Sequence, residues 1–172
     1  MTPIAPRVTV TQRPASTIAL LRPGDPGEPA MDAILAAAAA RGAVIKGVIL
    51  TSPVPDHAGG AHVAAERFGV PVLAAASAAR DASALVCGQV RAILDGDEVT
   101  LGDVPLHAVA TPGTHSGHLA LWASSVGVLL TGDLDGQGPS RGIPEPVDAG
   151  ELDRSLAKVR AIPAALRLPA HG

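Results

Sequence analysis

The sequence predicts a mixed α/β and α+β domain in which a half with alternating strands and helices is followed by a half built mainly from strands. Up to residue 73, apolar runs of strand length alternate with segments of helix length, and from residue 90 onward short strands separated by turns dominate. Alternation is typical of a parallel sheet covered by helices, whereas successive short strands favour an antiparallel sheet. The 172 residues suit a single domain, 1–172.

The first half is expected to contain three strands and two helices. Pro29 suits the first turn of a helix, and Gly42 and Gly69 are expected to end helices, because glycine readily adopts the left-handed conformation found there. The unbroken apolar run at 70–73 is typical of a strand buried on both faces. The expected strands are 17–21, 44–50 and 70–73, and the expected helices are 29–41 and 58–68.

The second half is expected to be a β-meander closed by one helix. Asp95-Gly96-Asp97 is a strong turn signal between two of its strands. Asp148 and Glu151 have the spacing of a capping box, with Asp148 as N-cap, and the helix that they open must end before Pro163. The expected strands are 90–94, 98–101, 106–110, 119–123, 126–130 and 166–168.

Composition excludes several classes of protein. The net charge of −3 is spread over mixed signs without basic clusters, which gives no support to nucleic-acid binding. Phe68 and Trp122 are the only aromatic residues, too few for a stacking platform. Cys87 is the only cysteine, so no intramolecular disulfide can form. Since no stretch of 18 apolar residues and no signal peptide is evident, we expect a soluble cytoplasmic protein without a membrane partner.

Four segments place His or Asp in a turn directly after an apolar strand. Ligands for one metal ion commonly come from several such loops, and imidazole and carboxylate together suit zinc, iron or manganese. The competing interpretation is a set of unrelated turn residues, because a lone His is more often a surface side chain and Thr-Gly-Asp is an ordinary turn. The segments are Asp56-His57, 111–118, 131–133 and His171-Gly172.

These segments resemble the motifs of the metallo-β-lactamase fold hydrolases, a family that includes glyoxalase II, lactonases and thioesterases. Residues 50–60 resemble Thr-His-x-His-x-Asp-His-x-Gly-Gly, and residues 111–118 resemble Thr-Pro-Gly-His-Thr-x-Gly-His with the His and the following Thr exchanged. Residues 129–133 are similar to the strand that delivers the family's bridging Asp, and residues 169–172 to its Pro-Gly-His-Gly. The resemblance implies a four-layer αββα sandwich, here shortened at both termini.

The resemblance also implies that the first of the family's two metal sites is lost. Its three ligand positions fall on Ser52, Val54 and Thr114. Valine has no donor atom, and a neutral hydroxyl is a poor zinc ligand compared with imidazole. This chain is therefore expected to be a divergent member of the family with one site empty.

The second site is expected to survive, with Asp56, His57, Asp133 and His171 as ligands for one zinc ion, or for iron or manganese. Asp56 and Asp133 are also the candidate catalytic carboxylates, because either could detach and accept a proton. An ordinary structural role competes for Asp56, which could cap a helix beginning near Ala58.

Two more histidines lie in the loop at 111–118. His115 is a candidate substitute for the missing first-site ligand if the loop shifts by one residue, and His118 is expected to orient a loop or ligand from behind the site. His62 and His107 are expected to be exposed residues on a helix and a strand.

Two functions follow from these predictions. The first is a hydrolase that uses a single metal ion, activating water for attack on an ester, thioester, lactone or amide of a small-molecule substrate. The second is a catalytically inactive relative that keeps the fold as a binding or assembly module and has no metal if the site has decayed. A second copy of the chain is a candidate partner, since both shortened termini could leave sheet edges to be covered.

Overall fold

The computed structural model describes residues 28–85, 89–100, 104–134 and 148–170. The expected strand at 17–21 and Cys87 lie outside these ranges. The described helices are α1 (Glu28–Ala39), α2 (Pro55–Ala58), α3 (Ala61–Phe68), α4 (Ala79–Leu85) and α5 (Ala149–Ala161), with short 3-10 turns η1 (Ala76–Ala78) and η2 (Ser124–Val126). The strands are β1 (Val48–Ile49), β2 (Val72–Ala75), β3 (Val90–Ile93), β4 (Glu98–Val99), β5 (Leu106–Ala110), β6 (Leu119–Ala123), β7 (Val128–Gly132) and β8 (Leu166–Pro169).

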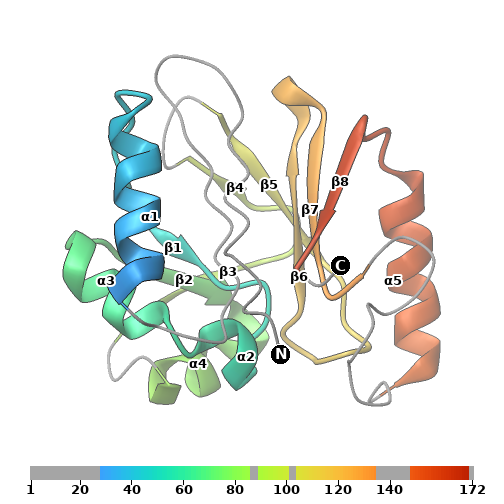
Figure 1. Ribbon diagram of the computed structural model, residues 1–172. Coiled ribbons are helices and arrows are strands. Elements are labelled where there is room, and N and C mark those ends of the chain that lie inside the picture. Colours follow the sequence, from blue (N-terminus) through green and yellow to red (C-terminus); the bar gives the residue numbers. More distant parts are fainter. Residues whose placement is uncertain (1–27, 86–88, 101–103, 135–147, 171–172) are drawn as a thin grey trace, which may run out of the picture.

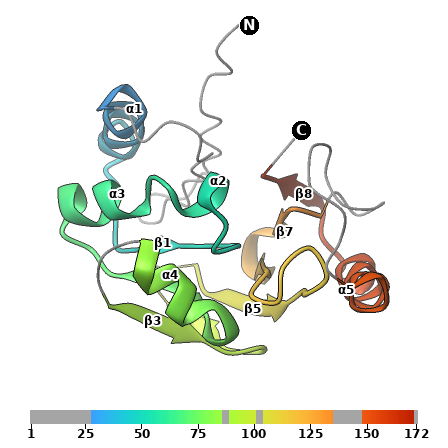
Figure 2. The ribbon, with the colours of Figure 1, turned by 90° about the horizontal axis from the view of Figure 1, so that it is seen from below.

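The elements form four layers, helix–sheet–sheet–helix (Figure 1). The first sheet has the order β1-β2-β3 and all its described pairs are parallel. The second has the order β4-β5-β6-β7-β8, antiparallel except for the parallel pair β7–β8. Helices α1, α3 and α4 lie on the outer side of the first sheet and α5 lies outside the second (Figures 1 and 2). The αββα sandwich expected from the motifs is confirmed.

Three apolar clusters fill the spaces between the layers. One lies between the two sheets and includes Leu73, Leu121 and Leu130. The second packs the first sheet against its helices, and the third packs α5 on the second sheet through Leu129. Neighbours such as Leu129 and Leu130 therefore serve different clusters, because side chains alternate across a strand. Both faces of β2, β6 and β7 are covered, which explains why these strands are largely apolar without alternation.

The expected helix at 58–68 is wrong at its start. The structure has two helices there, a single turn α2 and then α3, separated by Gly59 and Gly60. Pro55 begins α2, as expected for a proline in the first turn. Gly69 ends α3 in the left-handed conformation (φ 63°), which confirms that prediction. Asp56 and His57 thus lie on a short helix of their own.

Several strand boundaries also differ. Of the expected strand 44–50, only Val48 and Ile49 form ladder pairs with β2, and Leu50 N also donates to Leu73 O at 2.8 Å. The strand at Val90–Ile93 belongs to the parallel sheet, not to the meander, since it pairs with β2. The following turn, with Gly96 at φ 84°, therefore carries the chain from one sheet to the other. Helix α4 was not predicted, and β7 begins at Val128 because η2 includes Val126 and ends at Gly127 as its C-cap.

Strands β5 and β6 have the expected bounds. The expected N-cap of α5 is also confirmed: the Glu151 N–H donates to Asp148 Oδ1 at 2.8 Å. The helix ends with Ile162 as C-cap, one residue before Pro163.

Candidate metal centre

Three segments that are distant in sequence meet at one edge of the sandwich. They are α2, the β5–β6 loop at 111–118 and the end of β7 that carries Asp133. All three lie at the lower edge in Figure 1, and the view from below in Figure 2 shows the same edge from beneath. A backbone hydrogen bond of 2.7 Å from Leu119 N to Thr51 O joins the loop that precedes α2 to the β5–β6 loop. The motif residues are therefore gathered by the fold itself.

His57 contacts two side chains through its two ring nitrogens. Nδ1 lies 3.1 Å from Thr51 Oγ1, and Nε2 lies 2.7 Å from Asp133 Oδ1. The side chains of His57 and Asp133 are only 3% and 4% exposed. The structure thus brings together two of the four predicted second-site ligands in a buried contact. The side chain of Asp56 and the whole of His171 lie outside the described residues.

His118 contacts both the backbone and the carboxylate of Asp133. Its Nε2 accepts a hydrogen bond of 2.8 Å from the Asp133 backbone N–H and lies 3.9 Å from Asp133 Oδ2. Because Nε2 is an acceptor, the proton of the neutral ring is on Nδ1, which faces Thr111 Oγ1 at 2.8 Å and Thr111 O at 3.1 Å. Complete burial lowers the pKa of His118 to about 4, against the opposing influence of the Asp133 carboxylate. The ring is therefore neutral at pH 7. Its role in orienting a metal ligand stays a prediction.

Sequence reasoning missed the roles of Thr51 and Thr111. Each opens its motif at the end of a strand, and each places its hydroxyl on the Nδ1 of a histidine six or seven residues later. A threonine that follows an apolar strand and precedes a loop histidine was the signal that could have identified them. Partners of this kind set the tautomer and orientation of a histidine.

The three positions predicted to correspond to the first metal site offer little to a metal ion. Ser52 is fully buried, and neither its Oγ nor Thr114 Oγ1 has a hydrogen-bond partner among the described residues. Val54 is half-buried and is the N-cap of α2, without a side-chain cap. Two hydroxyls and an isopropyl group do not make a zinc site.

The loop at 111–118 is anchored on two sides. Ser155 of α5 donates to Pro112 O at 2.7 Å, and Ser77 of η1 donates to Ser116 O at 3.0 Å. A Cβ on Gly113 would overlap the backbone of α5 at Leu152, so glycine permits this close approach. The loop that carries the exchanged His-Thr pair is therefore closely packed.

The ring of His115 is held by its own loop. Its Nδ1 accepts the N–H of Gly117 at 3.0 Å, which leaves Nε2 as the nitrogen not used by its own loop. Its proposed rescue of the first site stays a prediction. The alternative role of Asp56 as a helix cap also stays a prediction, because its side chain lies outside the described residues; the N-cap of α3 is Gly60.

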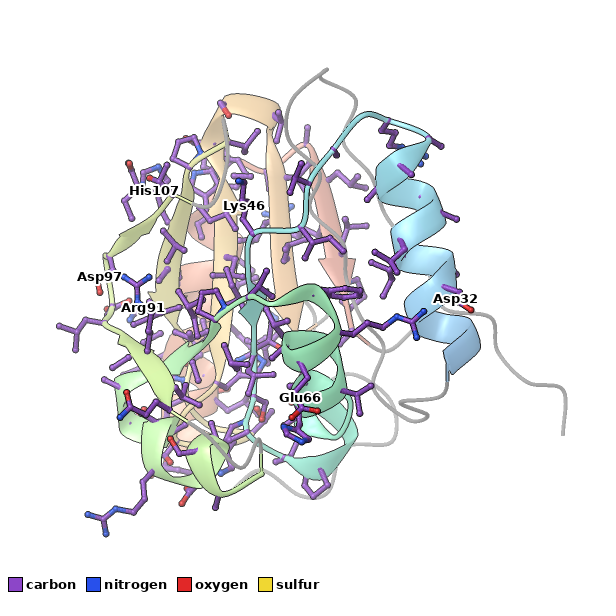
Figure 3. All side chains as sticks on the ribbon, turned by 90° about the vertical axis from the view of Figure 1, so that its left-hand side faces the viewer. Asp32, Lys46, Glu66, Arg91, Asp97 and His107 are labelled. Carbon is purple, nitrogen blue, oxygen red and sulfur yellow. The ribbon has the colours of Figure 1, made fainter. Side chains whose placement is uncertain are left out.

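The remaining histidines lie on the surface, as expected. His62 Nε2 lies 3.5 Å from Glu66 one helical turn away, and His107 lies 3.9 Å from Glu98 on the neighbouring strand. Their side chains are 40% and 37% exposed. Figure 3 shows Glu66 on the outer face of α3 and His107 near the upper end of the strands.

The fit of this centre to a metal ion is partial. Within the described ranges, no group of three or more His, Cys, Asp or Glu side chains is arranged around one ion. Two donors of one tetrahedral zinc ion lie roughly 3.4 Å apart, given bonds of about 2.1 Å, whereas His57 Nε2 and Asp133 Oδ1 are 2.7 Å apart. His57 Nε2 and Asp133 Oδ1 face each other, but they must separate by roughly 0.7 Å to admit an ion.

The sequence comparisons agree with this geometry. Residues 21–171 match the family described as the metallo-beta-lactamase superfamily. The chain belongs to this superfamily. Members of the superfamily bind metal ions such as zinc or iron. No helix within the described ranges combines the length and apolar character needed to cross a membrane.

A curated relative and solved structures extend the match. A hydroxyacylglutathione hydrolase from Rhodospirillum rubrum is 33% identical over 132 residues, which are 76% of this chain and 49% of the relative. This chain thus spans about half the length of that relative. The crystal structure of ETHE1 from Myxococcus xanthus superposes with a TM-score of 0.69 at 26% identity, covering 86% of this chain and 63% of that one. A protein crystallised in a di-iron-bound form superposes with a TM-score of 0.64 at 23% identity, covering 88% and 80%.

Proposed function

We propose that the protein is a metal-dependent hydrolase that holds one ion in the second site of the fold. The observation that supports this most directly is the buried contact between His57 Nε2 and Asp133 Oδ1, two predicted ligands from different elements. Asp56 and His171 complete the proposed ligand set. Membership of the superfamily supports the hydrolase class.

The surroundings of His57 suit both the empty and the filled site. Without an ion, Nε2–H donates to Asp133 and Nδ1 accepts from the Thr51 hydroxyl. With an ion on Nε2, the proton moves to Nδ1 and is donated to the same hydroxyl, which can accept as readily as it donates. The separation that the ion needs can come from the two side chains, because the Asp133 backbone is held by His118.

Asp133 is proposed to take the proton that the attacking water loses. An ion in this site supplies the Lewis acidity that makes such a water a nucleophile near neutral pH. The Asp133 carboxylate is buried, so it is screened little from charges nearby. His118 keeps its position, because the Asp133 N–H is fixed at 2.8 Å from the neutral ring. Asp56 is the alternative proton acceptor.

The proposed substrates are small molecules with an ester, thioester, lactone or amide bond. Among these, thioesters are the first class to test, since the relative from Rhodospirillum rubrum is named for an acylated glutathione. The proposed metal is zinc, with iron or manganese as alternatives. We also propose a cytoplasmic location and a homodimer.

The decisive experiment is elemental analysis of protein purified without added metal. We expect about one equivalent of zinc, iron or manganese per chain, and its loss in Asp133→Asn, which keeps the size of the side chain but not its charge. His107→Gln, on the surface and remote from this edge, is the matched control and should keep the metal. A wild-type protein that binds no ion even when zinc is supplied would refute the proposal.

A catalytically inactive binding or assembly module is the second candidate. It is favoured by the same contact, because His57 and Asp133 already satisfy each other at 2.7 Å without an ion. The module predicts that chelators leave the unfolding midpoint unchanged, whereas an ion bound only to the folded state must raise it.

A further inference from the structure

Helix α5 and its N-cap lie along the start of the β5–β6 loop and bind its backbone (Figures 1 and 2). Three donors follow one another along the helix, and their carbonyl acceptors follow in the opposite order along residues 110–113. The loop therefore meets the helix over an extended contact. The three bonds run from Asp148 N–H to Gly113 O at 3.4 Å, from Ser155 Oγ to Pro112 O at 2.7 Å and from Lys158 Nζ to Ala110 O at 3.1 Å.

The contacts come from one face of α5. Leu152, Ser155 and Lys158 are spaced by three residues, which places them in a row along the helix. A Cβ on Gly113 would overlap the helix backbone at Leu152, so the approach is close. Ser155 is only 2% exposed, and its hydroxyl would be unfavourable there without the bond to the loop. This face of α5 is therefore fitted to the loop as well as to the sheet.

Ala110, the last residue of β5, is held by two charged side chains. Its N–H donates to Asp95 Oδ1 at 2.6 Å, while its carbonyl accepts from Lys158. Lys158 Nζ also lies 3.2 Å from Asp95 Oδ2, which joins α5 to the turn between β3 and β4. Because both side chains of this pair are about half exposed, the ion pair itself is expected to contribute little. The position of Ala110 is nevertheless fixed from two elements.

The backbone that α5 binds also carries the partners of His118. Thr111 lies between two of the bonded residues, and its hydroxyl and carbonyl lie 2.8 and 3.1 Å from His118 Nδ1. The other ring nitrogen, Nε2, accepts the Asp133 N–H at 2.8 Å. A displacement of residues 110–113 must therefore move Thr111, and with it the ring that holds the Asp133 backbone.

We infer that Ser155 and Lys158 are positioning residues of the candidate metal centre, which hold Thr111 in place so that His118 stays bonded to Asp133. The inference rests on the proposed function where it concerns metal, and on the geometry alone where it concerns the Asp133 amide. The competing explanation is that these bonds only fasten α5 to the sandwich. In that case their loss would lower stability and leave the contacts of Asp133 unchanged.

The first test is hydrogen exchange of the Asp133 amide, measured by NMR in metal-free protein. Ser155→Ala should speed this exchange about 10-fold, because the bond from Asp133 N–H to His118 opens more often. Ser83→Ala removes a hydroxyl that donates at the same 2.7 Å to Ala79 O within α4, and should leave the amide unchanged. Val159→Ala, which removes buried apolar packing from α5 but keeps its bonds to the loop, should also leave it unchanged.

Lys158 provides a second variant on the same backbone. Lys158→Met should speed exchange of the Asp133 amide about 3-fold, less than Ser155→Ala because Lys158 is half exposed. Lys158→Arg keeps the charge and the donors and should restore the wild-type rate. If Ser155→Ala does not fold, the comparison of Lys158→Met with Lys158→Arg decides in its place.

The second test is zinc affinity, measured by titration of the folded proteins. The Kd for zinc should rise about 10-fold in Ser155→Ala and stay unchanged in Ser83→Ala and Val159→Ala, because reduced stability does not alter the affinity of a chain that remains folded. If the wild type binds no zinc, the hydrolase proposal fails, while faster exchange in Ser155→Ala alone still supports the positioning role. Unchanged exchange in both Ser155→Ala and Lys158→Met, equal acceleration in Val159→Ala, or an unchanged Kd in a zinc-binding Ser155→Ala would overturn the inference.

Discussion

The segments that meet at one edge of the sandwich, α2, the 111–118 loop and the end of β7, contain two groups of polar atoms. One group surrounds Asp133 and the other includes Ser52 and Thr114, and the two differ in how their polar atoms are paired. Around Asp133, the ring nitrogens of His57 and His118 all lie within 3.1 Å of a polar atom, supplied by Thr51, Thr111 or Asp133 itself. This half is a connected and buried network. Such a network holds its members in one arrangement, because each lost bond would leave a buried group unsatisfied.

The half around Ser52 and Thr114 has no comparable network. Both hydroxyls are buried without partners among the described residues, and Val54 has no polar atom to offer. The loop that carries Thr114 is nevertheless anchored by α5 and η1, and the same loop carries Thr111 and His118 of the network. This contrast is what we expect if the ligand side chains of the first site were replaced while the loops that carry them kept their positions.

The largest effect is expected from restoring the missing ligands. The triple variant Ser52→His, Val54→His, Thr114→His should bind a second ion, because the frame that presents these positions is in place. Zinc titration followed by elemental analysis should give one equivalent more than the parent protein.

The matched control carries Asn at the same three positions, similar in size but a poor zinc ligand, and should bind no additional ion. If the His variant also binds none, the loop geometry has diverged from the family and the alignment of residues 111–118 is wrong. The difference between the surroundings of Asp133 and those of Ser52 and Thr114 would then reflect a changed loop conformation as well as changed side chains.

A smaller effect is expected from pH in the metal-free protein. The pKa of His118 falls from 6.5 to about 4 on folding because burial disfavours the charged ring. Between these values the unfolded chain binds the proton more readily, so the stability due to the neutral ring is complete above pH 6.5 and is lost as pH falls toward 4. The loss from this residue is about 3 kcal/mol.

Urea denaturation at several pH values in the presence of a chelator measures this dependence. His118→Leu should be less stable at pH 7, because the Asp133 N–H and the Thr111 carbonyl lose a partner. It should also have a shallower pH dependence between 6.5 and 4. An equal slope in the two proteins would show that His118 is not the buried neutral histidine of the network.

The sequence predicted those parts of the fold whose signals are local. Asp148 capped α5 as expected, and the left-handed Gly69 ended α3, because both effects depend on a few neighbouring residues. The assignment of Val90–Ile93 to the meander failed because pairing with β2 depends on a residue nearly twenty positions earlier. The local sequence pattern does not indicate which sheet a strand joins.

For the candidate site, motif order predicted which residues meet but not what supports them. The contact of His57 with Asp133 follows from the expected convergence of strand-end loops. The bonds from Thr51 and Thr111 to histidine rings could not be derived, because a threonine after a strand is common and its hydroxyl direction depends on tertiary packing. The completeness of the four-ligand set stays a prediction.

A further effect is expected from a glycine that links the network to β7. Gly132 has φ 56°, and a Cβ there would overlap His118 Nε2 and lie 3.2 Å from Thr51 Cβ. Gly42 has a similar φ of 61° but open space around it, so Gly42→Ala measures backbone strain alone, about 1 kcal/mol. Gly132→Ala should cost about 2 kcal/mol more, because His118 must move and release the Asp133 N–H.

Urea denaturation and metal content together check this, since only Gly132→Ala should also lose metal. Equal destabilisation by the two substitutions, with metal retained in both, would mean that His118 can move at little cost in free energy and does not position the second site.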